Sequence, residues 1–162
     1  MSAEHGPGGA AKATFTAPPG VVVGAAVVRE GALLVQQRAF PAEVAGLWEL
    51  PGGGVEAGEP DTEAVRRECR EELGVDVVVG ERVGPDVPLP HGRVLRVFAA
   101  TMPDADARPR AVEHRALRWV SGHELAELDW LPADRALVPA LTALVTASAV
   151  PPPGGPDGAG LP

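Results

Sequence analysis

Residues 53–75 read GGVEAGEPDTEAVRRECREELGV, and this stretch carries most of the information about the fold and its chemistry. We expect the glycines at 52–54 to form a loop, which leads into a short helix crowded with carboxylates. A further glutamate, Glu59, lies between the glycines and the helix. A glycine loop followed by such a helix can hold a divalent metal ion against a phosphate chain. We therefore expect an enzyme that breaks a phosphoanhydride bond.

Three glutamates share one side of the expected helix. At about 100° per residue, Glu68, Glu71 and Glu72 fall within one arc of about 100°. An apolar stripe lies beside that arc, so the carboxylates are at the edge of the buried face rather than opposite it. The stripe consists of Val65, Cys69 and Leu73.

This crowding of negative charge calls for a compensating cation. Like charges three or four residues apart each destabilise a helix by roughly 0.2–0.5 kcal/mol when exposed, and partial burial raises that penalty. Mg²⁺ or Mn²⁺ removes the penalty, because both cations prefer oxygen ligands from carboxylates, water and phosphates. The alternative is a solvated face with salt bridges, since Arg67 and Glu71 are four residues apart.

Size and charge narrow the class of protein. The chain has 162 residues, which fits one domain, and its formal net charge is -8. We expect no nucleic-acid partner, because proteins that bind nucleic acid usually present a basic patch. A small phosphorylated substrate is still compatible with this negative charge, since bound cations can reverse the charge of a local site. The one cysteine, Cys69, excludes an internal disulfide and fits a reducing cytoplasm.

Neither a signal peptide nor a membrane span is expected. The N-terminal residues show no basic start followed by an apolar run, and no apolar stretch reaches the roughly 18 residues needed to cross a bilayer. Both ends are rich in small and polar residues, glycine and proline. We expect one domain at 19–148, flanked by disordered tails at 1–18 and 149–162.

The apolar pattern predicts an α/β/α sandwich around a mixed β-sheet. Asp61 or Thr62 is expected to cap the glutamate-rich helix and Gly74 to end it. Ser121 is expected to cap a short helix, and Pro139 predicts a kink or a late start in the last helix. The expected strands are 21–28, 32–37, 47–50, 77–79, 93–100 and 116–120, and the later helices are 124–128 and 133–147.

The glutamate-rich stretch resembles the signature of the Nudix hydrolases. That signature is Gly, five residues, Glu, seven residues, then Arg-Glu-apolar-x-Glu-Glu-x-Gly-apolar. Both gaps have the right length in this chain. The matching residues are Gly53, Glu59, Arg67, Glu68, Cys69, Glu71, Glu72, Gly74 and Val75.

The resemblance implies a role for each matching residue. It makes Glu68, Glu71 and Glu72 metal ligands, together with the backbone carbonyl of Gly52. It makes Glu59 and Arg67 a pair that braces the loop against the helix, with Gly53 and Gly74 as structural positions. We expect Cys69 to be a small buried apolar residue rather than a nucleophile.

Flanking segments resemble the MutT-type branch of the family. These segments are 46–53 (GLWELPGG), Glu113-His114 shortly before Trp119, and 129–138 (DWLPADRALV). Glu113 matches a MutT glutamate on a loop that faces the metals, where it is a further ligand or the general base; the alternative is an ordinary surface glutamate. We expect His114 to be a loop residue rather than a ligand.

Two more residues match positions that contact substrate in MutT-type enzymes. Arg38 matches an arginine that binds phosphates, which suits its planar guanidinium, and the alternative is a surface arginine. Asp134 matches a residue that reads the base, and the alternative is a helix N-cap. Gly54 departs from the usual lysine and removes one cation near the phosphates. Trp48 and Phe98 are candidates for base stacking, although we expect both in the core.

The resemblance implies a Mg²⁺- or Mn²⁺-dependent hydrolase that converts a nucleoside triphosphate into a monophosphate and pyrophosphate. Glu71, Glu68 and Glu113 are its candidate catalytic residues. We expect an 8-oxo-dGTP diphosphatase of nucleotide-pool sanitation, with CTP or dCTP pyrophosphohydrolase as the alternative. More distant alternatives are an ADP-ribose or nucleotide-sugar hydrolase and a catalytically silent binding module. We expect a cytoplasmic monomer or homodimer.

Overall fold

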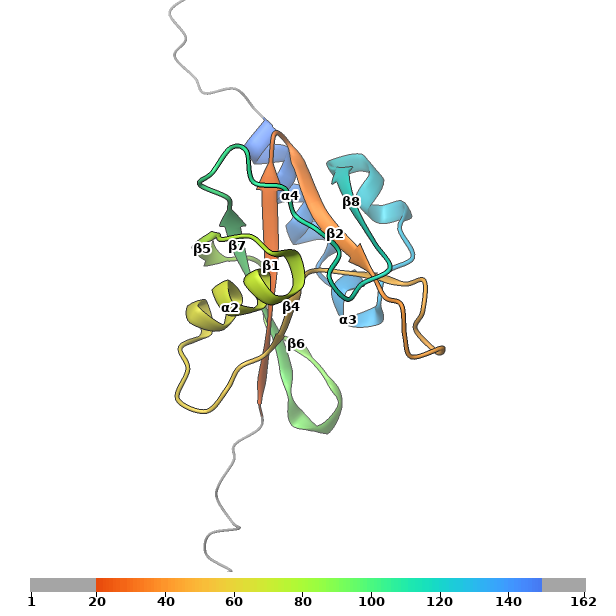
Figure 1. Ribbon diagram of the computed structural model, residues 1–162. Helices are drawn as coiled ribbons and strands as arrows, with labels where there is room; N and C mark the ends of the chain where they lie inside the picture. The colour runs from red at the N-terminus through yellow and green to blue at the C-terminus, as the bar shows by residue number, and fades with distance from the viewer. Residues whose placement is uncertain (1–19, 150–162) are drawn as a thin grey trace, which may run out of the picture.

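The structure, a computed structural model, describes residues 20–149 and is organised around one long central strand (Figure 1). This strand, β1 (Val21–Arg29), is buried over most of its length. One of its edges pairs in parallel with β7 (Val94–Thr101). The other edge is shared, because β4 (Gly52–Gly54) pairs with residues 22–24 and β2 (Ala32–Gln37) with residues 28 and 29. The sheet therefore splits beside the middle of β1.

The remaining strands extend the sheet on both sides of β1. The main strand order is β3-β2-β1-β7-β5, while β8 pairs with β2 and β6 pairs with β7. The parallel β1–β7 pair among antiparallel neighbours makes the sheet mixed. These strands are β3 (Trp48–Glu49), β5 (Val78–Arg82), β6 (Val87–Pro88) and β8 (Ala116–Ser121).

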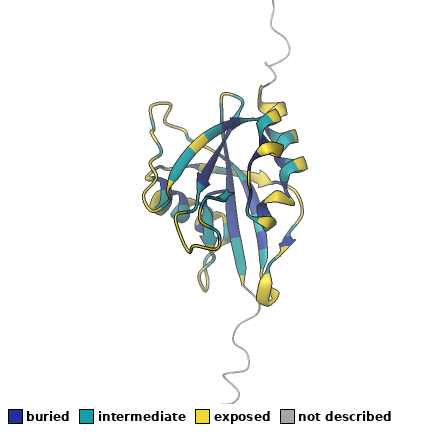
Figure 2. Ribbon diagram, turned by 90° about the vertical axis from the view of Figure 1, so that its right-hand side faces the viewer, coloured by how far each residue is buried: buried dark blue, intermediate teal, exposed yellow. Residues whose placement is uncertain are grey.

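Helices cover both faces of the sheet, so the expected α/β/α sandwich is confirmed. Helix α2 (Asp61–Leu73) packs on one face over Val23, Ala25 and Val27 of β1, and α4 (Val138–Ala149) packs on the other. Figure 2 shows the buried strands between the outer helices. The shorter helices are the 3₁₀ turns η2 (Pro90–Gly92) and η3 (Gly122–Glu127) and the single turn α3 (Pro132–Arg135).

The prediction that residues 52–54 form a loop is wrong. They form β4, in which Gly52, Gly53 and Gly54 lie opposite Gly24, Val23 and Val22 of β1. The absence of side chains is what permits this pairing. A Cβ atom at Gly52 would lie 1.9 Å from the carbonyl oxygen of Val23. Glycine here therefore allows close backbone approach, which is its other common use besides turns.

The predicted cap of α2 is also wrong, whereas its end is confirmed. The N-cap residue is Pro60, whose carbonyl accepts the amides of Glu63 and Ala64, and no side chain caps the helix. Asp61 instead lies in the first turn, where its carboxylate accepts a hydrogen bond from Arg96. Gly74 ends the helix in the left-handed conformation with φ 70°.

Most other predicted elements are present, with small shifts of their ends. Ser121 precedes η3 as its N-cap, and the last helix starts late, with Pro139 as the second residue of α4. The short strand β6 was not predicted, because two residues give no periodicity. The tails predicted at 1–18 and 149–162 lie outside the described residues, apart from Ala149 in α4. None of the helices described in residues 20–149 has the length and hydropathy of a membrane span.

Arg96 of β7 ties the start of α2 to the segment between β5 and β6. Its guanidinium donates to Asp61 at 2.8 Å and to both carboxylate oxygens of Asp86 at 3.0 and 2.7 Å. All three side chains are about one quarter to one third exposed. The pKa of Asp86 is lowered, first by its hydrogen bonds with Arg96.

We expect Arg96→Met to lower the free energy of unfolding by about 1–3 kcal/mol, because hydrogen bonds to two carboxylates are lost together. Urea denaturation measures this change. The matched control is Arg118→Met, which removes an exposed arginine 3.4 Å from Glu124 and should cost no more than about 0.5 kcal/mol. Equal losses in the two variants would contradict a structural role for Arg96.

Candidate active site

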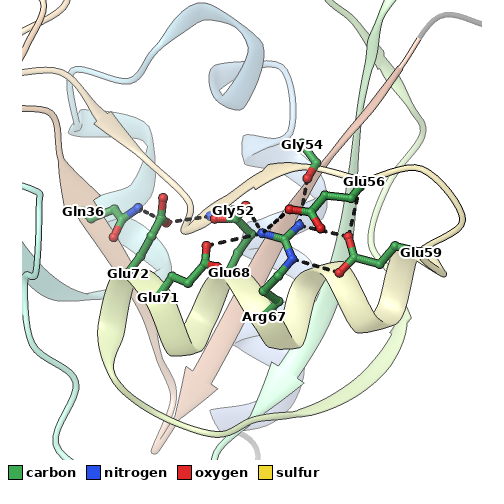
Figure 3. Close-up of polar contacts among 9 residues, drawn as sticks. All are labelled: Gln36, Gly52, Gly54, Glu56, Glu59, Arg67, Glu68, Glu71 and Glu72. Atoms are coloured by element: carbon green, nitrogen blue, oxygen red, sulfur yellow. Dashed lines mark hydrogen bonds and ion pairs between the residues drawn. The ribbon is translucent and has the colours of Figure 1, made fainter. Parts of the chain in front are cut away.

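Arg67 fastens the glycine-rich segment to α2. Its guanidinium donates to both carboxylate oxygens of Glu59, at 2.8 and 2.9 Å, and to the carbonyl oxygen of Gly54 at 2.9 Å (Figure 3). It also lies 3.0 Å from Glu68 and 3.3 Å from Glu71. The hydrogen bonds from Arg67 and from the Glu56 amide lower the pKa of Glu59 to about 2. Glu59 is therefore anionic at neutral pH.

Glu68 fills the space beside Gly53. Its side chain is 12% exposed, and a Cβ atom at Gly53 would lie 2.3 Å from Glu68 Oε2. No larger residue fits at position 53 unless this carboxylate moves. Burial raises the pKa of Glu68, and the hydrogen bond from Arg67 opposes that rise.

Glu72 is tied to two strands at once. Its Oε1 accepts hydrogen bonds from Nε2 of Gln36 on β2 at 2.8 Å and from the amide of Gly52 on β4 at 3.0 Å. Burial nevertheless raises its pKa to about 7, although both hydrogen bonds favour the anion. This carboxylate thus lies where the sheet splits, and a nearby cation would favour its charged form.

Glu71 is the most accessible of the three glutamates, with a side chain 57% exposed. All three carboxylates rise from one side of α2 toward the glycine-rich segment (Figure 3). Within residues 20–149, no three acidic, histidine or cysteine side chains already converge as a metal-binding group. The donor set is entirely oxygen, which fits Mg²⁺ or Mn²⁺. In this structure Glu68 and Glu71 instead contact Arg67, at 3.0 and 3.3 Å.

A small cavity brings predicted residues from three parts of the chain together. Arg38, Glu72 and Glu113 all line it, and its volume is about 120 Å³. Glu113 therefore lies beside Glu72 of α2. Arg38 is held here by Glu49, at 3.2 Å, and by two hydrogen bonds to the carbonyl oxygen of Phe40.

A second, larger cavity of about 500 Å³ opens on the other side of β3 and β4 and contains Asp134. Asp134 is 6% exposed and accepts the amide of Leu50 at 3.0 Å. The N-cap alternative for Asp134 is wrong, since Leu131 holds the N-cap position of α3. Burial raises the pKa of Asp134 to about 7. Valine, leucine and proline make up most of the lining, which also includes Glu49 and Gly52, and the amide of Gly52 donates to Glu72.

The remaining residues discussed from the sequence, Trp48, Phe98 and Cys69, all lie in the core. Phe98 is buried under α2, and Trp48 packs partly buried against the opposite core, so both belong to the core as expected. Neither lines the larger cavity. Cys69 is a fully buried residue of α2, and burial raises the pKa of its thiol to about 12. Cys69 is an apolar residue in effect, and its thiol is no nucleophile at neutral pH.

Three polar residues of this region were missed by sequence reasoning: Gln36, Glu49 and the buried ring of His114. Gln36 and Glu49 lie opposite each other in the β2–β3 ladder. The side chain of His114 is 8% exposed, and its Nε2 lies 2.8 Å from Glu49 Oε2. The one available signal was Gln36 at the end of an apolar strand, where a fully buried polar side chain needs a partner.

Comparison with known proteins identifies the family of this chain. Residues 18–141 match the NUDIX domain family. A Mycobacterium tuberculosis protein named "Putative 8-oxo-dGTP diphosphatase 2" is 46% identical over 132 residues, covering 80% of this chain and 92% of that protein. The Escherichia coli protein named CTP pyrophosphohydrolase is 41% identical over 123 residues, covering 76% of this chain and 91% of that protein.

Solved structures agree as well. The solution structure of the E. coli ORF135 protein has a TM-score of 0.68 at 40% identity, covering 79% of this chain and 91% of that one. A MutT NUDIX hydrolase from Burkholderia pseudomallei has a TM-score of 0.62 at 32% identity, covering 76% and 98%. The chain belongs to the Nudix hydrolase family, whose members generally need a divalent metal ion, usually Mg²⁺.

The raised pKa of Asp134 predicts how stability depends on pH. Below about pH 4 the carboxyl group is protonated in both folded and unfolded chains. Between about pH 4 and 7 only the unfolded chain loses the proton, so this group's contribution to stability is lost as pH rises through the folded pKa of about 7. Asp134→Asn keeps an oxygen acceptor for Leu50 and removes the titration.

We therefore expect the stability of the wild type, relative to Asp134→Asn, to fall steadily between pH 4 and pH 7. Urea denaturation at a series of pH values measures this difference. Asp129→Asn at an exposed position is the matched control, and it should change stability by no more than about 0.5 kcal/mol at each pH. A difference for Asp134→Asn that stays constant with pH would rule out a buried, titrating carboxyl group.

Proposed function

We propose that this protein is a Mg²⁺-dependent nucleoside triphosphate pyrophosphohydrolase that releases a nucleoside monophosphate and pyrophosphate. The observation that carries the proposal is the position of Glu68, Glu71 and Glu72. They share one side of α2, next to the backbone of β4. Glu72 lines the smaller cavity, and Gly52, whose amide donates to Glu72, lines the larger one. One cavity contains an arginine, which suits phosphate, and a further glutamate, which suits a metal ion or a proton acceptor. The other cavity is largely apolar, which suits a base. Relatives named as a diphosphatase and a pyrophosphohydrolase support the same reaction.

Each group of the site has a task in this reaction. Glu68, Glu71, Glu72 and the carbonyl oxygen of Gly52 would hold the metal ions. When bound, Mg²⁺ neutralises charge on the phosphates and lowers the pKa of a water molecule. Glu113, or a glutamate of α2, accepts the proton from the attacking water. Hydrolysis of a phosphoanhydride needs little covalent help from the protein, so positioning of these groups dominates catalysis.

Arg38 is the side chain best placed to bind phosphate oxygens. Its guanidinium currently donates to Phe40 and Glu49 at the small cavity, and a phosphate can replace the carbonyl of Phe40 as acceptor. Gly54 supplies no side-chain cation at the position where MutT-type enzymes usually have lysine. Arg38 and the bound metal must therefore provide most of the positive charge that the triphosphate meets.

Asp134 is our candidate for reading the base. Its carboxyl group lies in the wall of the apolar cavity, which is large enough for a purine or a pyrimidine. With a pKa of about 7 it is partly protonated at neutral pH, so it both donates and accepts hydrogen bonds. Adjacent donor and acceptor groups are present on 8-oxoguanine and on cytosine. We propose 8-oxo-dGTP as the substrate, with CTP or dCTP as the second candidate.

Glu71→Gln should lower kcat by at least about 10²-fold, because an amide removes one anionic ligand and one candidate base. Pyrophosphate release in the presence of Mg²⁺, with EDTA as the blank, measures the loss. Glu63→Gln is the matched control, since Glu63 lies exposed in the same helix, 3.7 Å from Arg66 and away from the glycine-rich segment. Wild-type activity in Glu71→Gln would reject the proposed metal site.

A substrate panel separates the branches of the family. We expect metal-dependent turnover of 8-oxo-dGTP to exceed that of CTP, dCTP, ADP-ribose and a nucleotide sugar. Preference for CTP or dCTP would select the second candidate, and preference for ADP-ribose or the nucleotide sugar would reject both. No turnover of any compound would leave a binding module. The cytoplasmic location and the monomeric or homodimeric state stay predictions from the sequence.

A further inference from the structure

The segment at 110–115 bridges the end of α2 and strand β2. At one end, the amides of Arg110 and Val112 donate to the carbonyl oxygens of Leu73 and Glu72, at 2.9 and 3.3 Å. These are carbonyls of the last helical turn, which need donors from outside the helix. At the other end, the amide of Arg115 donates to Gln37 at 2.8 Å. The segment is therefore attached to α2, which carries the three glutamates, at one end and to β2 at the other.

Glu113 lies in the middle of this bridge without support of its own. It is exposed, and within residues 20–149 its carboxylate makes no hydrogen bond or salt bridge. It lines the small cavity together with Glu72. The backbone around Glu113 must therefore set its position beside Glu72.

His114, the next residue, supplies a side-chain attachment to that backbone. Its ring is almost completely buried, and its Nε2 lies 2.8 Å from Oε2 of Glu49, a residue 65 positions earlier in β3. A carboxylate accepts hydrogen bonds, so Nε2 carries the proton in this contact. The same oxygen of Glu49 also accepts from Arg38 at 3.2 Å, so two side chains hold this carboxylate.

We propose that His114 and Glu49 are positioning residues whose contact holds Glu113 in place above Glu72. The proposal rests on the proposed function, in which Glu113 acts as a ligand or base. His114 does not itself reach the substrate in this role, since its Nε2 is engaged by Glu49 and its Nδ1 is buried. Without the contact, the bridge keeps only its backbone hydrogen bonds, and Glu113 is free to move.

Two substitutions of His114 test its contact with Glu49, because they differ in how far the side-chain nitrogen lies from the backbone. The amide nitrogen of glutamine extends about as far from the backbone as Nε2 of histidine, whereas that of asparagine is one methylene shorter. His114→Gln should therefore keep the hydrogen bond to Glu49 and most of the activity. His114→Asn should lower kcat by about 10–100-fold, as is usual when the support of a metal ligand is removed. KM should stay unchanged, because Arg38, the side chain proposed to bind phosphate, keeps its contact with Glu49.

A double variant shows whether His114 acts through Glu113. In a Glu113→Gln background, His114→Asn should cause no further loss of kcat, because the group that it positions is already gone. The matched control is His123→Asn, at an exposed histidine beyond β8, which should match the wild type. Loss of activity in His114→Gln equal to that in His114→Asn would overturn the proposal, as would additive losses in the double variant.

Amide hydrogen exchange tests the contact independently of activity. His114→Asn should speed exchange at Arg115 and Val112, whose amides hold the two ends of the bridge, and leave β1 unchanged. His114→Gln should resemble the wild type. Unchanged exchange in His114→Asn would overturn the proposal whether or not any nucleotide is hydrolysed. An inactive wild type with the expected exchange pattern would instead reject the proposed function alone.

Discussion

The close approach of a backbone without side chains to both β1 and α2 is the constraint on which the site depends. Gly52 has no room for a Cβ atom against the backbone of Val23, and a Cβ atom at Gly53 would require the carboxylate of Glu68 to move. Because this segment lies so near, the amide of Gly52 reaches the carboxylate of Glu72, and Arg67 reaches the carbonyl of Gly54. The helix and the strand thus hold each other in register, and the carboxylates gather at the point where the sheet splits.

Charge compensation follows from the same arrangement. Arg67 is shared by Glu59, Glu68 and Glu71, so one guanidinium balances much of the negative charge along α2. A second shared group, Glu49, lines the apolar cavity and binds both Arg38 and His114 beside the smaller one. The two cavities are therefore linked through a single carboxylate of β3.

The sequence predicted those parts of the fold that depend on local pattern. The spacing of the glutamates and Gly74 located α2, and the apolar runs located β1, β2 and β7. The low strand propensity of glycine led to the wrong prediction of a loop at 52–54. A strand forms there because these residues pair with an edge of β1, which no local sequence pattern reveals. The contact between His114 and Glu49 was out of reach for a similar reason. It joins residues 65 positions apart, and no local sequence pattern at either residue predicts a contact with the other.

Cys69 illustrates what burial beside Glu68 and Glu72 does to a reactive group. It is the one cysteine of the chain, it has no exposed surface, and a thiol with a pKa of about 12 is almost never a thiolate under physiological conditions. Peroxides and alkylating agents attack the thiolate form at an accessible sulfur. The folded protein therefore offers such reagents no thiol target.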